Sequence, residues 1–217
     1  MDDKERQAAF LTALTTEHFV LQTAASATVS EAAARASLYV LSLSSSLVAM
    51  GFASRSQEVF LSFAAAVLPS LFLLGLFTVY RLVDTGIENQ QYLTGIARIR
   101  AYYRTLTPEA TVYFSAESGR WPESHQSPPL RYGALVAFLT TAASMIAFIN
   151  SMVAGAGVAL LMSHLLVRER IVIALGFGVA TALVLMIAFL VFQRWRYSVS
   201  APPLSALLQE EAPRDRS

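Results

Sequence analysis

Residues 171–193 read IVIALGFGVATALVLMIAFLVFQ and contain no Asp, Glu, Lys or Arg. A helix needs about 20 apolar residues to cross a hydrocarbon core about 30 Å thick. Three further runs without these charged residues span 36–53, 59–80 and 133–163. The sequence therefore predicts an all-α membrane protein with four transmembrane helices. The alternative is a soluble protein with four buried core helices, but such helices are shorter and carry a polar stripe.

The composition agrees with this prediction. The chain is 55% hydrophobic and 14% charged, whereas soluble domains carry about 25% charged residues. The net charge of +1 indicates no general affinity for nucleic acid. The chain has no Cys, which excludes disulfides, thiolate metal sites and a Cys nucleophile.

The segment before the first span is also predicted to be helical. Residues 7–34 are rich in Ala and contain neither Gly nor Pro. No helix breaker separates them from the first span, so we expect one helix from about residue 7 to residue 53. One face of this helix follows a 3-4 spacing and holds Leu11, Leu14, His18, Leu21, Ala25, Thr28 and Ala32.

The second span follows closely, so spans one and two are predicted to form an antiparallel hairpin. Pro69 lies near the middle of span two and predicts a kink, because proline removes one backbone hydrogen bond. Beyond this span a 4-3-4-3 spacing resembles a coiled-coil seam, formed by Tyr92, Ile96, Ile99, Tyr103 and Leu106. Three arginines, Arg98, Arg100 and Arg104, are predicted to lie off this seam.

We predict that the two seams pack together as a cytosolic stalk. The seam residues are Leu14, His18, Leu21, Tyr92, Ile96, Ile99 and Tyr103. In the alternative, each helix lies separately on the lipid headgroups.

The rest of the chain is predicted from composition and length. Residues 107–130 hold four prolines and are expected to form a loop. As a straight helix, residues 133–163 would measure about 46 Å, so a kink, a turn or a protruding tilted helix all remain open. The glycines and Asn150 lie in the second half of this segment.

The predicted organisation has five parts. They are a cytosolic N-terminal helix that continues into the first span (1–35), a first transmembrane hairpin (36–80), a cytosolic helix with a Pro-rich loop (81–131), a second transmembrane hairpin (132–196) and a disordered cytosolic tail (197–217).

The orientation follows from the basic residues near the spans. With the N-terminus in the cytosol, 13 basic residues lie on the cytosolic side and 3 lie outside. Basic residues favour the cytosolic side, and aromatic residues mark the interfaces. The aromatic anchors at the cytosolic side are Tyr80, Tyr132, Trp195 and Tyr197. The sequence thus predicts a multi-pass cell-membrane protein with both termini in the cytosol.

No motif for catalysis is present. His18, His125 and His164 are far apart in the sequence, and there is no metalloprotease, phosphate-loop or nucleophile-elbow motif. We predict no catalytic, cofactor or metal site. No ionisable residue lies within the spans, which disfavours ion-coupled transport but not a passive pore.

The first span is rich in small residues. Ser42, Ser45, Ser46 and Ala49 recur at three- and four-residue spacing, which permits close helix approach in lipid. Gly176 and Gly178 offer the same in the fourth span. The contact is either within one protomer or between protomers, and the sequence does not separate the two.

Two short stretches carry a resemblance to a known family. They are Thr16–Gln22, which reads TEHFVLQ, and residues 35–39, which read RASLY. They resemble stretches of uncharacterised actinobacterial multi-pass membrane proteins. More distantly, residues 8–106 resemble the SLATT and Pycsar-type transmembrane effectors of antiphage defence.

The distant resemblance implies oligomerisation in the membrane after a nucleotide signal, with loss of membrane integrity. The chain departs from that group by having two further spans and no recognisable cyclic-nucleotide-binding domain. We therefore predict a non-enzymatic protein of the lipid bilayer that forms a homo-oligomer and acts as a pore-forming or membrane-perturbing effector. The alternative is an accessory subunit that docks a cytosolic protein, and a small-molecule transporter is less favoured.

Overall fold

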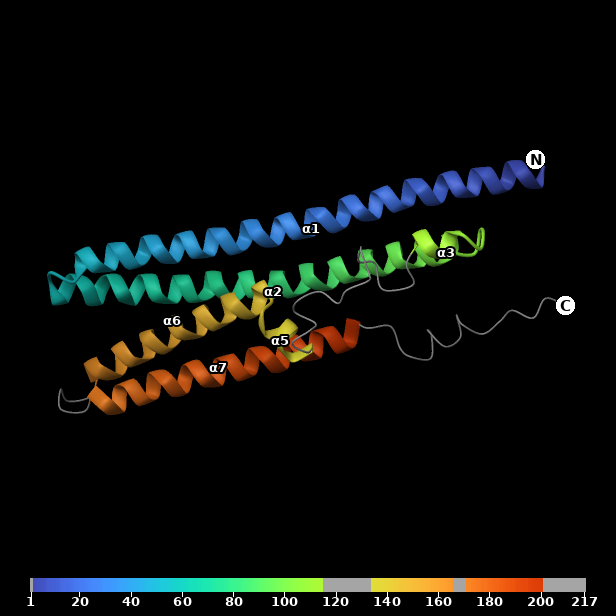
Figure 1. Cartoon of the computed structure of the whole chain (residues 1–217). Helices are drawn as coiled ribbons and strands as arrows, with labels where there is room; N and C mark the ends of the chain where they lie inside the picture. Colours follow the sequence, from blue (N-terminus) through green and yellow to red (C-terminus); the bar gives the residue numbers. More distant parts are fainter. Residues whose placement is uncertain (1, 115–133, 166–170, 201–217) are drawn as a thin grey trace.

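The computed structural model describes residues 2–114, 134–165 and 171–200, and every regular element in these ranges is a helix (Figure 1). The all-α prediction is confirmed. Four helices are long and apolar enough to cross a membrane: α1 (Asp3–Ala53), α2 (Gln57–Tyr103), α6 (Ala142–Leu165) and α7 (Ile171–Ser200). Two short helices, α3 (Ala110–Tyr113) and α5 (Ala134–Leu139), lie between α2 and α6 along the chain.

The first helix is uninterrupted, as the lack of breakers predicted. At about 1.5 Å per residue, α1 measures about 76 Å, more than twice the thickness of a hydrocarbon core. It begins before residue 7 because Asp2 caps it. The Asp2 carboxylate accepts a hydrogen bond from the Asp3 backbone at 2.7 Å, and the Glu5 carboxylate accepts one from the Asp2 backbone at 3.1 Å. This pair is a capping box.

The second span and the helix predicted after it are one helix. α2 continues through Pro69 and through Gly86 without interruption. Gly86 lies where α7 approaches, since a Cβ at this position would stand 2.5 Å from the Tyr197 hydroxyl. Both residues therefore lie inside a helix that extends well beyond the second apolar run.

The third apolar segment is interrupted at Thr140 and Thr141. The sequence drew attention to its second half, around Asn150, but α6 is continuous there. The interruption lies instead at the start of α6, where the Thr141 hydroxyl accepts a hydrogen bond from the Ser144 backbone at 3.2 Å. This contact caps the N-terminus of α6 and separates it from α5.

Two predicted boundaries were wrong. Residues 110–113 were expected to be part of a loop but form α3, where the Thr107 hydroxyl accepts a hydrogen bond from the Ala110 backbone at 3.3 Å. The tail was expected to begin at residue 197, whereas α7 continues to Ser200 because its last turns pack on α2 near Gly86. Residues 115–133 and 201–217, which hold most of the predicted loop and tail, lie outside the described residues.

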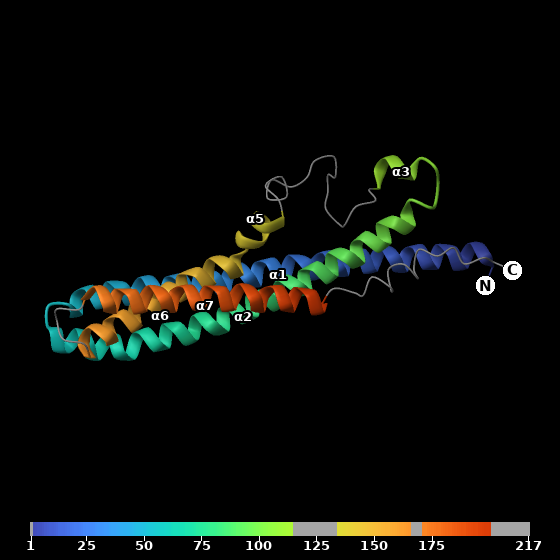
Figure 2. The same cartoon turned by 90° about the horizontal axis from the view of Figure 1, so that it is seen from below.

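The four long helices form two antiparallel hairpins, α1–α2 and α6–α7, which meet mainly through α2 and α6 (Figures 1 and 2). In Figure 1 they follow the order α1, α2, α6, α7, so α1 and α7 lie at the edges. The turn between α1 and α2 and the neighbouring ends of α6 and α7 define one end, here called the turn end. At the other end, the extended end, α1 and α2 reach furthest, and residues 3–35 and 82–103 are called the stalk.

The core lies near the middle of the molecule, where all four long helices contribute side chains. Tyr39 of α1 and Val83 of α2 are fully buried there. The buried cluster consists of Tyr39, Val79, Leu82, Val83, Ile87, Ala143, Ile146, Ala147 and Phe189. This cluster fixes how the stalk joins the rest of the molecule.

Candidate functional site: contacts between the helices

A buried polar contact joins α1, α2 and α6. The Tyr39 hydroxyl donates a hydrogen bond to the Asn150 side-chain oxygen at 3.1 Å, and the Asn150 amide donates to the Phe72 backbone oxygen at 3.2 Å. Gly75 permits this approach, because a Cβ there would lie 2.2 Å from the Asn150 oxygen. The contact satisfies polar groups that would otherwise be unpaired among apolar helices.

A second polar cluster joins the start of α6 to α7. Gln193 is fully buried, and its amide donates to the Thr141 hydroxyl at 3.3 Å. The Ser144 hydroxyl donates to the Gln193 oxygen at 3.1 Å. Because Thr141 also caps α6, this cluster ties the position of α7 to the point where α6 begins.

The two helices α6 and α7 make their closest contact at a pair of glycines. A Cβ on Gly155 would lie 2.6 Å from the Gly178 backbone oxygen, and a Cβ on Gly178 would lie 2.6 Å from the Gly155 backbone oxygen. Ala159 and Ala182 flank this crossing. Small residues allow such backbone approach between helices in lipid. Gly176, predicted with Gly178, lies on the exposed side with nothing within 4 Å of its Cβ position.

Ion pairs connect three helices between the stalk and the apolar spans. The Arg81 guanidinium donates to both oxygens of Glu31, at 2.9 and 3.2 Å. Arg35 also donates to Glu31, at 2.8 Å, so one carboxylate holds two arginines. On the other side of α2, Arg196 of α7 pairs with Asp84.

These contacts alter the titration of Glu31. Hydrogen bonds from Arg81 and then Arg35 lower the pKa of the Glu31 carboxyl to about 2. The reciprocal hydrogen bond raises the pKa of Arg81. Glu31 therefore stays ionised at every physiological pH, and the link between α1 and α2 at this level stays charged.

In the stalk, α1 and α2 pack along much of the two predicted seams. Ile96 and Ile99 are buried, while Leu14, Tyr92 and Tyr103 are half-buried. Further contacts follow the same line: Leu21 lies over Gly95, Thr15 lies 3.5 Å from the Tyr103 hydroxyl, and Phe10 meets Tyr102 edge to face. The structure thus brings the predicted seam residues of both helices to one interface.

The stalk also contains an unsatisfied basic pair. His18 is half-buried, and its Nδ1 atom is buried without a hydrogen-bond partner. Desolvation, and then the charge of Arg100, lower the pKa of His18. Arg100 was predicted to lie off the seam, but it is half-buried and has a buried nitrogen without a partner. The reason is that it follows Ile96 by four residues and so shares its face of the helix.

The predicted small residues of the first span divide between two faces. Ser42, Ser46 and Ala49 are half-buried within the protomer, whereas Ser45 is exposed. The hydroxyls of Ser42 and Ser45 donate to backbone oxygens of their own helix, at 2.8 and 2.9 Å. Only Ser45 of the four is therefore placed where another chain could reach it without moving α2.

One stripe along the exposed side of α1 carries no charge, with the exposed Glu17 and Arg35 beside it. Its residues recur every three or four positions, lie on one side of the helix and are all exposed: Thr12, Thr16, Val20, Thr23, Ala27, Ser30, Ala34, Leu38, Leu41, Ser45, Val48 and Phe52. We call this surface the outer face of α1. In contrast, the exposed side of α2 in the stalk includes Gln90, Gln91 and Arg98.

Several of these contacts were not predicted. The pairing of Asn150 with Tyr39 and the buried position of Gln193 had no signal in the local sequence. Arg81 and Arg196 were counted only as topology signals. For Arg81, the nearby Glu88 was the available sign of ion pairing, whereas Asp84, the partner of Arg196, is far from it in the sequence.

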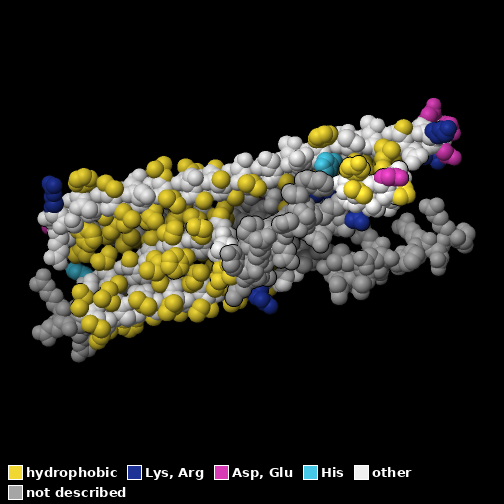
Figure 3. All heavy atoms as spheres, viewed as in Figure 1, with side chains coloured by type: hydrophobic (Ala, Val, Ile, Leu, Met, Phe, Trp, Pro, Cys, Tyr) yellow, Lys and Arg dark blue, Asp and Glu magenta, His cyan; other side chains and the backbone are white. Residues whose placement is uncertain are grey.

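No candidate metal centre occurs in the described ranges, where no three His, Asp or Glu side chains gather. His18 lies in the stalk part of α1 and His164 near the end of α6 at the turn end, and His125 lies outside the described residues. Figure 3 shows hydrophobic side chains covering the half of the molecule toward the turn end.

The chain matches no protein-family model, and neither a curated protein nor a solved structure is significantly similar to it. The resemblance of residues 8–106 to transmembrane effectors therefore stays a prediction.

Proposed function

We propose that this chain is a non-enzymatic integral membrane protein that self-associates through the outer face of α1 and perturbs the membrane as an oligomer. The observation that supports this most is the absence of charge along that face from Thr12 to Phe52. An exposed helix face in water is normally polar and charged. An uncharged face is better explained by a protein partner.

Lipid cannot cover the whole outer face. The span predicted in α1, residues 36–53, rises about 27 Å, which is close to the thickness of one hydrocarbon core. The preceding residues 3–35 extend about 50 Å further. In that part Val20 of the outer face is 56% exposed, so its apolar surface would face water in a lone protomer.

A second copy of α1 fits this face. Copies inserted in one membrane are parallel, so their outer faces can meet along the full length. An uncharged face meets its own copy without like-charge repulsion. Ala27, Ala34 and Ser45 are small and allow close approach. In a symmetric oligomer the same contact repeats at every copy.

The proposal also includes the orientation of the protein in the membrane and its role in perturbing the membrane. Basic residues favour the cytosol for the extended end, where the N-terminus and the ends of α2 and α7 gather. Assembly through α1 would bring Ser45 and its copies together inside the bilayer, with hydroxyls facing a contact between chains.

Single-cysteine cross-linking tests self-association, because the chain has no Cys of its own. We expect Ala27→Cys and Ser45→Cys each to form a disulfide-linked dimer in native membranes under mild oxidation. A disulfide requires Cα atoms within about 7 Å. The matched control is Ala33→Cys, which is exposed on another side of α1 and should give no dimer.

The outcomes separate the parts of the proposal. Dimers from Ala33→Cys but not from Ala27→Cys would contradict the outer face as the interface. The absence of dimers from all three variants would contradict self-association. A potential-sensitive dye on induced expression tests the effector role, and a parent chain that assembles without depolarising the cell would contradict that role alone.

A charged variant links assembly to activity. Thr23→Glu with Ala27→Glu places like charges on the outer face, and we expect both cross-linking at Ser45→Cys and depolarisation to be lost. Ala33→Glu should leave both unchanged. Depolarisation that persists after cross-linking is lost would show that the two are unrelated.

One observation favours the accessory-subunit alternative. Val112 is 80% exposed and Tyr113 is 68% exposed on α3, next to the tip of the stalk. Such a pair is suited to docking a cytosolic protein. Val112→Asp should leave cross-linking intact in either case, and only an accessory subunit would lose a co-purifying partner.

A further inference from the structure

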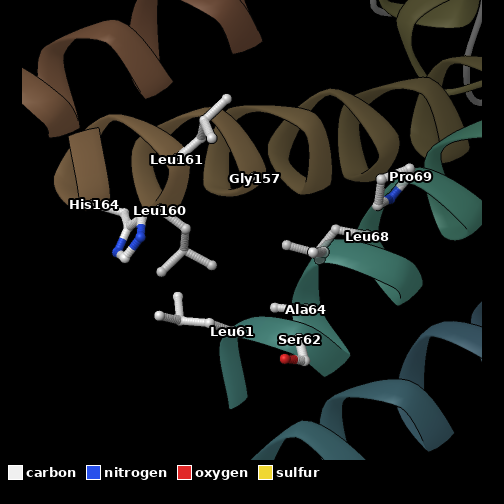
Figure 4. Close-up of a pocket in the computed structure, with 10 residues that line it drawn as sticks. Leu61, Ser62, Ala64, Leu68, Pro69, Gly157, Leu160, Leu161 and His164 are labelled. Carbon is white, nitrogen blue, oxygen red and sulfur yellow. The ribbon is translucent and has the colours of Figure 1, made fainter. Parts of the chain in front are cut away.

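A groove opens between α2 and α6 toward the turn end (Figure 4). Its volume is about 500 Å³, within the roughly 300–1,000 Å³ range of small-molecule sites. The walls are almost wholly apolar and are formed by Leu61, Ala64, Ala65, Leu68, Pro69, Gly157, Leu160 and Leu161.

The polar side chains of the groove lie at one end. Ser62 lies near the start of α2 and His164 near the end of α6, and both line the groove. Pro69 and Gly157 lie about 10 Å deeper along their helices. Neither the Ser62 hydroxyl nor the His164 imidazole has a hydrogen-bond partner among the described residues. The groove thus has a polar mouth and an apolar interior.

The contacts around the groove explain why it stays open. Further in, Asn150 fixes α6 against α2 through the Phe72 backbone oxygen. Toward the turn end, Gly157 contributes no side chain, and its Cβ position is still 3.7 Å from the nearest atom of Leu68. An unfilled gap loses dispersion contacts on its walls, so a molecule that fills it is favoured.

We propose that this groove binds one acyl chain of a phospholipid, with the lipid phosphate at His164. One leaflet of a hydrocarbon core is about 15 Å deep, so an apolar groove about 10 Å deep lies within a single leaflet. Its mouth lies near the helix ends, where headgroups gather. The imidazole N–H donates hydrogen bonds, which phosphate oxygens accept.

The lining of the groove favours a lipid as its occupant. A water-soluble ligand would leave the apolar walls uncovered. A single acyl chain meets both the shape and the polarity, and this proposal is independent of self-association through α1.

Photolabelling in nanodiscs tests the proposal. The probe is phosphatidylglycerol with a diazirine on one acyl chain, and labelled residues are mapped by peptide sequencing. We expect labelling to concentrate on residues 61–69 and 157–164. Gly157→Leu fills the groove and should lower labelling there about tenfold, which corresponds to about 1.4 kcal/mol. The matched control, Gly176→Leu, points into open space and should label as the parent does.

A second arm tests the headgroup contact. A diacylglycerol with the same diazirine chain lacks the phosphate, and we expect the parent to label less with it than with the phospholipid. His164→Ala should abolish that difference while keeping the acyl-chain label in the groove. Equal labelling by the two probes in the parent would overturn the phosphate site.

Three further results bear on whether the groove binds lipid. Labelling that is unchanged by Gly157→Leu, or that spreads evenly over α7, would overturn the groove as a lipid site. A chain-to-chain cross-link mapped to the groove would identify a second copy as the occupant and overturn the proposal. If Gly157→Leu does not accumulate, Ala65→Leu on the opposite wall provides the same test.

Discussion

The α6–α7 hairpin and the stalk of α1 and α2 bring their helices together by different means. In α6–α7 two backbones touch at Gly155 and Gly178. In the stalk, larger side chains fill the space, as Ile99 does within the seam and Leu21 does over Gly95. Lipid gives no hydrophobic drive between helices, so close backbone packing must hold them. Water does give that drive, so apolar side chains suffice.

Polar contacts also join helices inside the apolar region, as Gln193 does between α6 and α7. α1, α2 and α6 are joined there by the hydrogen bonds of Tyr39 and Asn150, in addition to packing. These bonds bring together residues that are far apart in the chain. The two hairpins therefore differ in how the two helices of each hairpin pack on each other. The contact between the two hairpins includes the hydrogen bonds of Tyr39 and Asn150.

The largest effect is expected from truncating the stalk seam. Ile99→Ala should destabilise the protein by about 3 kcal/mol, because it leaves a cavity between two helices that water does not fill favourably. Thermal unfolding in detergent, followed by far-ultraviolet circular dichroism, measures the loss.

The control for this truncation is Ile187→Ala on α7, where the side chain is 61% exposed. Lipid or detergent can take the place of the lost atoms, so little change is expected. Equal losses in both variants would mean that the stalk seam is no better packed than a lipid-facing surface.

An intermediate effect is expected at the glycine crossing. Gly178→Ala places a Cβ against a backbone oxygen that cannot move aside, and we expect a loss of about 2 kcal/mol in the same unfolding measurement. Gly95→Ala in the stalk meets only the flexible end of Leu21, at 2.9 Å. The gain in helix propensity should keep the change there below about 1 kcal/mol. A reversed order would contradict the distinction between the two hairpins.

The smallest effect is expected from the ion pairs where the stalk meets the apolar spans. The folded protein holds the pKa of Glu31 at about 2, below its ordinary value of 4.5. Its contribution to stability is therefore present above pH 4.5 and is lost as the pH falls toward 2. Glu31→Gln should remove this dependence in acid unfolding scans. Glu17→Gln, which removes a carboxylate without an arginine partner among the described residues, should retain it.

The sequence predicted the helices well because the signals are local. The lack of breakers before residue 53 correctly predicted one long α1, and the runs without charge correctly identified four helices able to span a membrane. The position of the interruption before α6 was left open, because a threonine cap depends on which side chain hydrogen-bonds to the backbone. The approach of Tyr197 to Gly86 was not predicted, because it joins residues that are far apart in the sequence.

What the sequence by itself determined is the number, length and apolar character of the helices, since these depend on residues that are neighbours along the chain. Only the tertiary structure decided which small residues face inward. Gly178 is enclosed and Gly176 is open, and Ser46 is half-buried while Ser45 is exposed. The two members of each pair lie close together in the sequence. Which member faces inward depends on how the helix is rotated about its axis. That rotation is set by contacts with distant segments, such as the hydrogen bond from Asn150 to α2.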